Sequence, residues 1–387
     1  MTFFLVASAI KVFLVLNLML VGVALLTLLE RRVCAWMQDR LGPNRVGPQG
    51  LLQPAADGLK NILKEETTPA LADKALFTLA PIVSFVPAML TFGVIPFAAP
   101  LRTKWGDVPM VVADLPVGFL YILAISSLGV YGIVLAGWAS NNKYALLGGL
   151  RASAQMISYE IALGMSTVAV LLLAGNVTLT QVIAQQQQGL WFIIPLTLAF
   201  VIFFISAFAE TNRLPFDLPE AEGELIAGYH TEYSAMKFSM FYIAEYSNMV
   251  TASALMATLF FGGWDIPFTS WDSTGEPTLP KTLLTLAVFG LKTFAFLFTF
   301  IWVRWTLPRF RYDQLMALGW KVLLPLALLY ITILAAAIWV LRVPFGWPYG
   351  VGMAAVLGGL NVLLLIGLVW WLDRGRIVSG SVAQETA

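Results

Sequence analysis

Residues 3–29 read FFLVASAIKVFLVLNLMLVGVALLTLL and contain one charged side chain, Lys11. As an α-helix this stretch would extend about 40 Å, which is more than the ~30 Å hydrocarbon layer of a bilayer. It lacks the basic segment and the small-residue cleavage site that are typical of a signal peptide. The sequence therefore predicts a retained membrane-spanning helix over these residues.

Similar apolar runs recur along the whole chain of 387 residues, of which 59% are hydrophobic and only 12% charged. The charged share is about half that of a soluble domain. The nine predicted membrane segments are residues 3–29, 76–97, 117–138, 155–175, 190–209, 238–263, 282–303, 322–341 and 350–372. We therefore expect an all-α fold, a polytopic membrane bundle of about nine transmembrane helices. Eight of these helices and the long loops would form a membrane domain over residues 1–349, and residues 350–387 would add an extra C-terminal helix and tail.

The distribution of Lys and Arg predicts the orientation of these helices. Seventeen of the 23 basic residues follow the odd-numbered segments, five lie on the opposite side, and Lys292 lies within a segment. Because basic residues favour the cytoplasmic side, we expect the N-terminus outside and the C-terminus in the cytoplasm. The long cytoplasmic loops would then cover residues 30–75, 139–154, 210–237 and 304–321.

Within the first of these loops, apolar residues recur at helical spacing. They are Leu51, Leu52, Ala55, Ala56, Leu59, Ile62 and Leu63. Polar residues such as Asp57 and Lys60 fall between them. The pattern predicts an amphipathic helix along the membrane interface, which could equally be a simple surface anchor.

The counts of cysteine and histidine limit the chemistry of the chain. One cysteine (Cys34) and one histidine (His230) cannot form a four-cysteine iron–sulfur site, a bis-histidine haem or a structural zinc site. The sequence has no P-loop and no basic tract, so neither nucleotide nor nucleic acid is an expected ligand. If the protein takes part in redox chemistry, partner subunits must carry the electrons.

Three glutamates, Glu160, Glu210 and Glu245, lie inside or at the edge of apolar segments. An ionisable group at that depth is costly unless it faces a polar interior or stays protonated, so each is a functional candidate. The alternative is a buried acid that only holds helices together. Lys292 is either a counter-charge for such an acid or a side chain that snorkels to the interface.

The loop after the fifth segment is strongly acidic around a single arginine, Arg213. Its carboxylates, within 23 residues, are Glu210, Asp217, Glu220, Glu222, Glu224 and Glu232. Asp217 with Glu220 three residues later resembles a helix N-cap with its capping-box partner. Repelling carboxylates raise one another's pKa, so a chain of them could bind and pass protons near neutral pH. The alternative is a solvated acidic loop.

Arginines recur in the same predicted cytoplasmic layer. They are Arg31, Arg32, Arg40 and Arg45 in the first loop and Arg304, Arg309 and Arg311 after the seventh segment. Positive-inside topology accounts for some of them, and pairing between arginines and carboxylates of different loops would account for more.

Four long polar motifs resemble one known family. They are Glu30-Arg31-Arg32 with Arg40 to Pro48 (RLGPNRVGP) and Leu51-Leu52-Gln53; Gly137 to Asn141 (GWASN) with Lys143-Tyr144, Leu150-Arg151-Ala152 and Ile157 to Glu160 (ISYE); Glu210 to Glu224; and Arg309 to Leu315 (RFRYDQL). These motifs resemble the loops of the NuoH family, the quinone-site membrane subunit of respiratory complex I (NADH:quinone oxidoreductase), called NADH dehydrogenase subunit 1 in mitochondria. The resemblance covers about residues 20–335 and suggests the bacterial type with a ninth helix.

This resemblance implies a translocase subunit that forms a chamber for ubiquinone or menaquinone and couples its reduction to proton translocation. The implied quinone-chamber residues are Arg31, Arg40, Asp57, Arg213, Phe216 and Asp217, with Arg304, Arg309 and Arg311 in support. The implied proton path comprises Glu160, Glu210, Glu220, Glu222, Glu224 and Glu245.

The family further implies that this chain binds no redox cofactor or metal, and that partner subunits carry FMN and the iron–sulfur clusters. Expected partners are the hydrogenase-like large subunit, the subunit with the terminal cluster, small membrane subunits of the pumping arm, and lipid. The expected location is the bacterial plasma (inner) membrane.

Two features depart from the family pattern. Some relatives have a carboxylate in the third helix, where this chain has Ser126 and Ser127, so a water-bridged route or one relay group fewer would be needed. Residues 350–387 are missing from shorter members. Two alternatives remain: the equivalent subunit of an energy-converting hydrogenase or related dehydrogenase, and a stand-alone proton or cation transporter.

Overall fold

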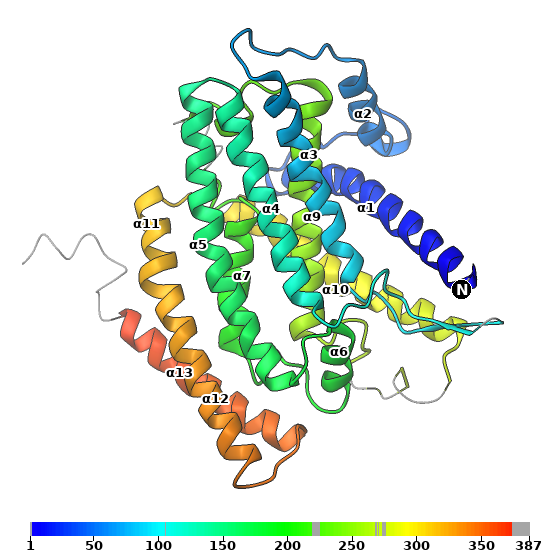
Figure 1. Ribbon diagram of the computed structural model, residues 1–387, viewed down its shortest axis with the longest axis vertical. Helices are drawn as coiled ribbons and strands as arrows, with labels where there is room; N and C mark the ends of the chain where they lie inside the picture. Colours follow the sequence, from blue (N-terminus) through cyan, green and yellow to red (C-terminus); the bar gives the residue numbers. More distant parts are fainter. Residues whose placement is uncertain are drawn as a thin grey trace, which may run out of the picture.

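The computed structural model describes residues 2–104, 106–218, 225–267, 269, 271–272 and 276–373 (Figure 1). Its α-helices are α1 (Thr2–Met37), α2 (Gln53–Leu63), α3 (Lys74–Thr91), α4 (Gly118–Ala139), α5 (Lys143–Ala174), α6 (Leu179–Gln187), α7 (Thr197–Glu210), α9 (Ala235–Phe260), α10 (Leu279–Thr306), α11 (Tyr312–Ala317), α12 (Leu324–Arg342) and α13 (Val351–Asp373). A short antiparallel hairpin, β1 (Leu101–Thr103) and β2 (Gly106–Val108), follows α3. A π-helix, Leu318–Leu323, joins α11 to α12.

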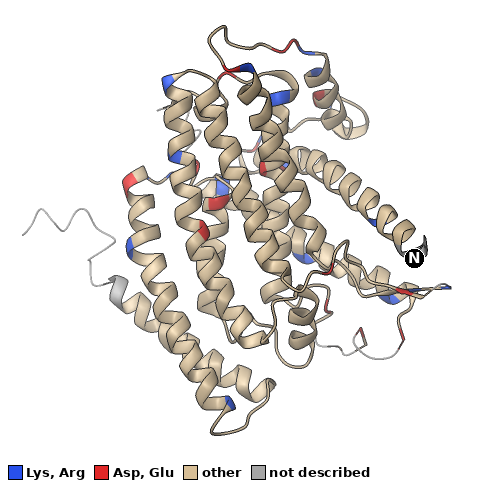
Figure 2. Cartoon of the chain, viewed as in Figure 1, with Lys and Arg blue, Asp and Glu red and all other residues tan. Residues whose placement is uncertain are grey.

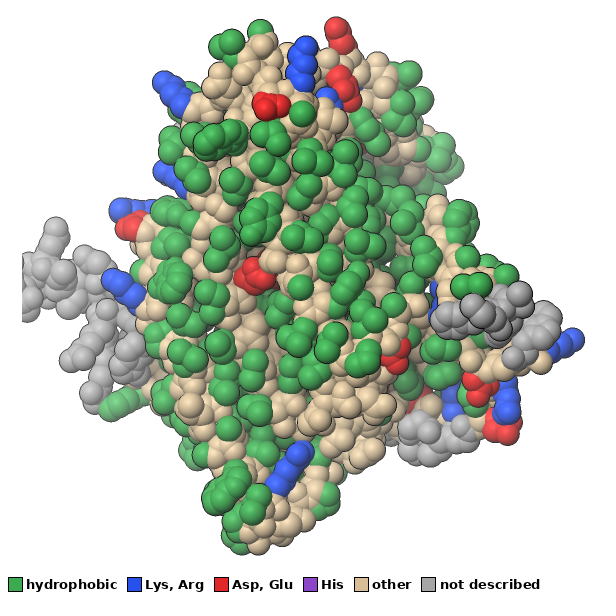
Figure 3. Space-filling view, in the orientation of Figure 1, with side chains coloured by type: hydrophobic (Ala, Val, Ile, Leu, Met, Phe, Trp, Pro, Cys, Tyr) green, Lys and Arg blue, Asp and Glu red, His purple; other side chains and the backbone are tan. Residues whose placement is uncertain are grey.

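Seven helical segments of the described residues are long and apolar enough to cross a membrane. They are Leu5–Met37, Lys74–Val94, Gly118–Ala139, Lys143–Ala174, Leu279–Thr306, Tyr312–Arg342 and Val351–Trp370. Hydrophobic side chains cover most of the face shown in Figure 3, as expected for a surface in contact with lipid. In Figure 2 most charged positions lie toward the helix ends. The prediction of an all-α polytopic membrane bundle is confirmed.

Helices α3, α4, α5, α7 and α9 pack side by side in the centre of the molecule (Figure 1). Helices α1 and α10 extend to one side, and α11 to α13 lie on the other. Glycine permits the closest approach between α3 and α4. A Cβ at Gly132 would lie 2.2 Å from Oγ of Ser84, which no side chain could tolerate. Small residues therefore set the helix spacing here, as they do in other membrane bundles.

Several helices extend into ranges that were predicted as loops. Helix α1 continues to Met37, because Glu30, Arg31 and Arg32 are good helix formers and the backbone first turns to positive φ at Asp39. Helix α5 begins at Lys143, where Oδ1 of Asn142 caps it by accepting the N–H of Tyr144 at 2.9 Å. Most of residues 139–154 is therefore helical.

The predicted loop 304–321 is also largely helical. Helix α10 continues to Thr306, and α11 begins at Tyr312 and runs through the π-helix into α12. Only residues 307–311 separate the two. The capping box between Arg311 and Gln314 starts α11, a signal that the sequence interpretation did not use.

The fifth and sixth predicted segments are displaced. Helix α7 starts at Thr197 rather than residue 190, because Pro195 disfavours helical geometry at Ile194. Its 14 residues extend only about 21 Å. Helix α9 ends at Phe260 rather than 263, since Gly262 and Gly263 have φ of 72° and 56°. Neither helix belongs to the seven above, so a total of nine spanning helices stays a prediction.

A helix does form in the first loop, as α2. It buries none of its residues, and Leu59, Ile62 and Leu63 are exposed. Its place at the membrane interface stays a prediction.

Candidate functional site

A cluster of buried charged side chains joins α1, α9, α10 and the segment after α7. We call it the Glu30 cluster; it comprises Glu30, Arg213, Glu245, Tyr246 and Arg304. Nη1 of Arg213 donates to both carboxylate oxygens of Glu30, at 3.1 and 3.3 Å, and Nε of Arg213 lies 2.6 Å from Oε1 of Glu245. The hydroxyl of Tyr246 donates to Oε2 of Glu30 at 2.7 Å, and Nη1 of Arg304 pairs with Oε1 of the same carboxylate.

The Glu30 cluster balances two carboxylates against two guanidinium groups. Arg213 and Glu30 are each only 5% exposed, and the guanidinium of Arg213 lies 4.3 Å from the centre of the Tyr246 ring. Burial alone would lower the pKa of Arg213, but the charges of Glu245 and Glu30 raise it well above its usual value. Charges this deeply buried persist because each has a partner.

A second ion pair lies in the loop that follows α7. Nη2 of Arg309 donates to Oδ2 of Asp217 at 3.1 Å. Burial raises the pKa of Asp217 above its usual value, although Arg309, Arg304 and Arg213 all oppose that shift. Oδ1 of Asp217 is also buried and finds no hydrogen-bond donor within the described part of the chain. This oxygen is therefore available to a proton or to a polar ligand.

The start of this loop is packed against the bundle and is not a solvated acidic loop. The ring of Phe216 contacts those of Tyr159 and Phe310, with centroids 5.6 and 5.5 Å apart. Nε2 of Gln155 donates to the carbonyls of Ala209 and Phe216, both at 2.8 Å. These bonds fix residues 210–218 on α5 and on the segment before α11.

Glu210, the last residue of α7, lies near two other predicted positions. Its side chain shares a hydrogen bond with that of Ser126 on α4, and it is within electrostatic range of Glu160 on α5. Oγ of Ser126 also donates to the carbonyl of Leu123 at 3.1 Å. The hydroxyl therefore occupies the place where some relatives have a third-helix carboxylate.

Other predicted site residues lie toward the surface. Nη1 of Arg31 pairs with Oδ2 of Asp57 at 2.6 Å, which ties α1 to α2. Nε of Arg40 donates to the side chain of Gln38 at 2.7 Å. Arg311 pairs with Asp313 in its own segment and is largely exposed.

Some predicted residues cannot be placed in this site. Glu220, Glu222 and Glu224 lie outside the described residues, as does the predicted capping partnership of Asp217 with Glu220. Among the residues that are described, no group of three or more His, Cys, Asp or Glu side chains could hold a metal ion.

The sequence interpretation missed Glu30 and Tyr246 as site residues. A signal for Glu30 was present, because a lone acid at the end of a long apolar run is costly unless it has a partner. Tyr246 had no such signal, since tyrosine is common in membrane helices.

Lys292 is not a counter-charge within this site. Its Nζ donates to the carbonyls of Phe261, Gly263 and Asp265, at 2.7, 3.0 and 2.6 Å. It also lies 4.1 Å from the ring centre of Trp191. The side chain reaches the polar end of α9, as in the snorkelling alternative.

The fold and the Glu30 cluster together define a polytopic membrane protein with a buried, charge-balanced site. The NADH dehydrogenase family model matches residues 10–335. Among curated relatives, the chain is 54% identical over 323 residues to one H-type membrane protein of NADH-quinone oxidoreductase from Geobacter metallireducens, covering 84% of this chain and 94% of that protein. It is 50% identical over 351 residues to an H-type protein of the same enzyme from Koribacter versatilis, covering 86% and 97%. It is 51% identical over 347 residues to the H-type protein from Frankia alni, covering 89% and 75%.

The chain belongs to the NuoH family, the H-type membrane subunits of NADH-quinone oxidoreductase (complex I). The predicted resemblance is confirmed.

Proposed function

We propose that the chain forms one wall of the quinone chamber and couples quinone reduction to proton translocation. The observation that carries this proposal is the Glu30 cluster, which holds four charged groups in a low-dielectric region. A site of this kind responds strongly to a nearby change of charge, because little water is present to screen it.

The chamber would lie along the described part of the loop after α7. Arg213, Phe216 and Asp217 are the proposed inner lining, and the buried Oδ1 of Asp217 supports a polar ligand there. Arg31, Arg40 and Asp57 would form its exposed outer end.

The first loop also supports a covering partner. Leu41 is 86% exposed and Leu63 is 75% exposed, although both are apolar. Peripheral subunits of the complex, namely the hydrogenase-like large subunit and the subunit with the terminal iron–sulfur cluster, would cover this surface.

Coupling would begin at Arg213, because Glu30 and Glu245 share its guanidinium. Two electrons that reach the quinone create negative charge or draw in protons. Negative charge near Arg213 would weaken its hold on one carboxylate and favour protonation of that group. At ~4 Å and an effective dielectric constant of about 20, one unit charge is worth about 4 kcal/mol, or roughly three pKa units.

A proton would then pass between carboxylates. Glu245 is within electrostatic range of Asp217 and Glu30, and Glu210 is within range of Glu160. The hydroxyl of Ser126 can donate to an ionised Glu210, or accept from a protonated Glu210 while it donates to Leu123. We infer that Ser126 serves where other members have a carboxylate. Glu220, Glu222 and Glu224 would continue the path, with small membrane subunits of the pumping arm beyond it.

The basic residues support an orientation with the Glu30 cluster toward the cytoplasm and the N-terminus outside. A bacterial inner membrane fits the organisms of the relatives. The relatives are named as subunits of NADH-quinone oxidoreductase, which favours that branch over an energy-converting hydrogenase or a stand-alone transporter.

Arg213→Ala in the assembled complex tests the role of the cluster. Quinone reductase activity should fall far more than electron transfer from NADH to a soluble artificial acceptor, which needs only the peripheral subunits. Arg311→Ala is the matched control, because Arg311 is exposed and pairs only within its own segment. Equal loss of both activities in Arg213→Ala would indicate a folding defect and count against the proposal.

A further inference from the structure

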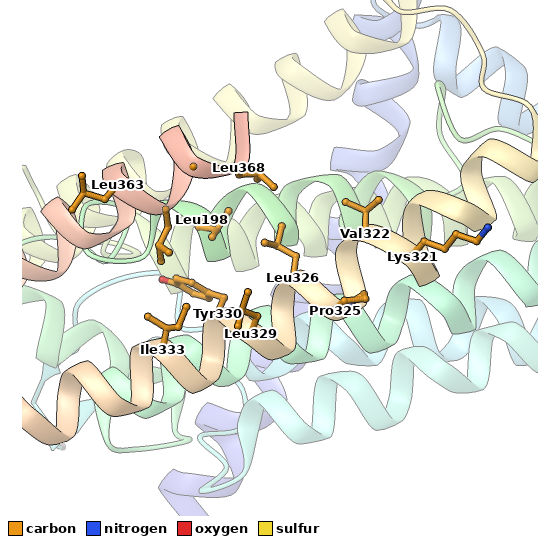
Figure 4. A pocket seen from close by; sticks show the side chains of 12 residues that line it. Leu198, Lys321, Val322, Pro325, Leu326, Leu329, Tyr330, Ile333, Leu363 and Leu368 are labelled. Atoms are coloured by element: carbon orange, nitrogen blue, oxygen red, sulfur yellow. The ribbon is translucent and has the colours of Figure 1, made fainter. Parts of the chain in front are cut away.

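A groove runs between α12 and α13, away from the Glu30 cluster (Figure 4). Its volume is about 490 Å³. Aliphatic side chains of three helices form most of its walls, among them Leu326, Leu329 and Ile333 of α12, Leu364 and Leu368 of α13, and Leu198 of α7. A surface of this composition binds hydrocarbon.

The polar groups beneath the groove already have partners. The hydroxyl of Tyr330 donates to Oδ1 of Asn361 at 3.1 Å. Nδ2 of Asn361 donates to the carbonyls of Pro195 and Leu357, at 2.5 and 2.9 Å. These bonds hold α13 against α7 and α12 and leave an apolar surface above them. A ligand in this groove therefore needs hydrocarbon rather than hydrogen-bonding groups.

The dimensions of the groove exclude a helix as its occupant. From Lys321 to Ile333 it extends about 18 Å at the helical rise of 1.5 Å per residue, so its mean cross-section is about 27 Å². An α-helix at least ~10 Å in diameter has a cross-section of about 80 Å². A single extended hydrocarbon chain is the slimmer occupant that fits.

One end of the groove carries a positive charge. Figure 4 shows the ammonium group of Lys321 at this end, beyond the aliphatic side chains. Lys321 belongs to the π-helix Leu318–Leu323, a rare geometry that is frequent at functional sites. The neighbouring Trp320 is half-exposed and donates Nε1 to Oγ of Ser158 at 3.0 Å. Trp and Lys are typical of the level of the lipid headgroups.

We propose that this groove binds one acyl chain of an anionic phospholipid, with the lipid phosphate on Nζ of Lys321. Basic residues beside grooves between membrane helices select anionic headgroups in this way. The bound lipid would fill the space between α12 and α13 and join the extra C-terminal helix to the bundle. The proposal is independent of the quinone and proton roles above.

Photo-crosslinking in the purified, assembled complex tests this assignment. The probe is phosphatidylglycerol with a diazirine in the middle of one acyl chain, and peptide mass spectrometry locates the labelled residues. Labels are expected on Leu326, Leu329 and Leu364. Unlabelled phosphatidylglycerol should compete with the probe, and phosphatidylcholine of the same chain length should compete far less.

Three variants separate the headgroup from the groove. Lys321→Gln removes the charge of an exposed side chain and should lower labelling about fivefold. Leu329→Trp fills the groove and should abolish labelling. Leu328→Trp is the matched control, because Leu328 is 47% exposed on the same helix and does not line the groove, and it should label as the wild type does.

Several results would overturn the proposal. Equal competition by both lipids, or unchanged labelling of Lys321→Gln, would exclude recognition of an anionic headgroup. Equal labelling of Leu329→Trp and Leu328→Trp would exclude the groove. A diazirine-bearing quinone that labels the same leucines and is displaced only by quinone would assign the groove to a quinone tail.

Discussion

Glu245→Gln tests whether the charge of the Glu30 cluster, rather than its shape, drives coupling. Glutamine has nearly the shape of glutamate, and its Oε1 can still accept the N–H of Arg213 that now lies 2.6 Å from Glu245. The substitution therefore removes one negative charge and keeps the contact. Arg213 and Arg304 would then face Glu30 as their only carboxylate within the cluster.

The size of this perturbation follows from the ion-pair distance. At an effective dielectric constant of about 20, the attraction between unit charges 2.6 Å apart is about 6 kcal/mol. Desolvation offsets part of it, and loss of one partner from a buried pair costs roughly 3–5 kcal/mol. If about 1.4 kcal/mol of this enters the barrier to turnover, the rate falls tenfold.

We expect Glu245→Gln to lower quinone reductase activity of the assembled complex at least tenfold and to leave reduction of a soluble artificial acceptor unchanged. Native gels and subunit mass spectrometry establish that assembly is intact. Glu66→Gln is the control, since Glu66 pairs at the surface with Lys237 at 3.2 Å, and exposed pairs of this kind contribute about 1 kcal/mol or less. Wild-type turnover and pumping in an assembled Glu245→Gln complex would exclude a role for this charge in coupling.

Three further predictions concern other parts of the chain. Glu210→Gln should abolish quinone turnover or pumping without loss of assembly; Ser126→Ala should reduce pumping in vesicles while Ser127→Ala, whose hydroxyl bonds its own helix, does not, and equal effects of the two would remove Ser126 from the path. Burial lowers the pKa of His230 to about 4, below its usual 6.5, so protonation opposes folding and stability should fall between pH 6.5 and 4 by roughly 3 kcal/mol; thermal inactivation of the solubilised complex should therefore depend less on pH in His230→Phe than in the wild type, and identical slopes would contradict this. Asn361→Leu should loosen α13 and expose residues near 345–350 to protease, unlike a substitution at the exposed Val362.

The pKa of Asp265, which burial raises to about 6, acts in the opposite direction from that of His230. Folding favours its protonated form, so its contribution to stability rises as the pH falls from about 6 toward 4. Both His230→Phe and the wild type carry this contribution. The difference between the two proteins at each pH therefore reports His230 alone.

The class of protein follows from the amino-acid sequence without any knowledge of packing. Runs such as residues 3–29 are too long and too apolar for anything but a membrane span, and that conclusion needs only length and transfer free energy. The polar motifs, among them Arg40 to Pro48 and Arg309 to Leu315, were specific enough to identify the family. Isolated acids such as Glu210 stood out because charge is costly in an apolar segment.

Helix boundaries were less accessible to the sequence because they depend on local capping and on proline. Asn142 starts α5 and Pro195 delays α7, and neither changes the average hydropathy of its segment. Helix α1 likewise continued through Glu30 because its charged residues favour the helix and find partners outside it.

The pairing of the charges depends on the three-dimensional packing. Glu30, Arg213 and Glu245 lie more than 180 positions apart or on different helices, and their pairing follows from how α1, α9 and α10 cross. The same holds for Lys292, which reaches three carbonyls at the end of α9, and for the groove that α12 and α13 form over Leu198. Hydropathy depends on one residue at a time, whereas an ion pair or a groove depends on the relative positions of segments far apart in the chain.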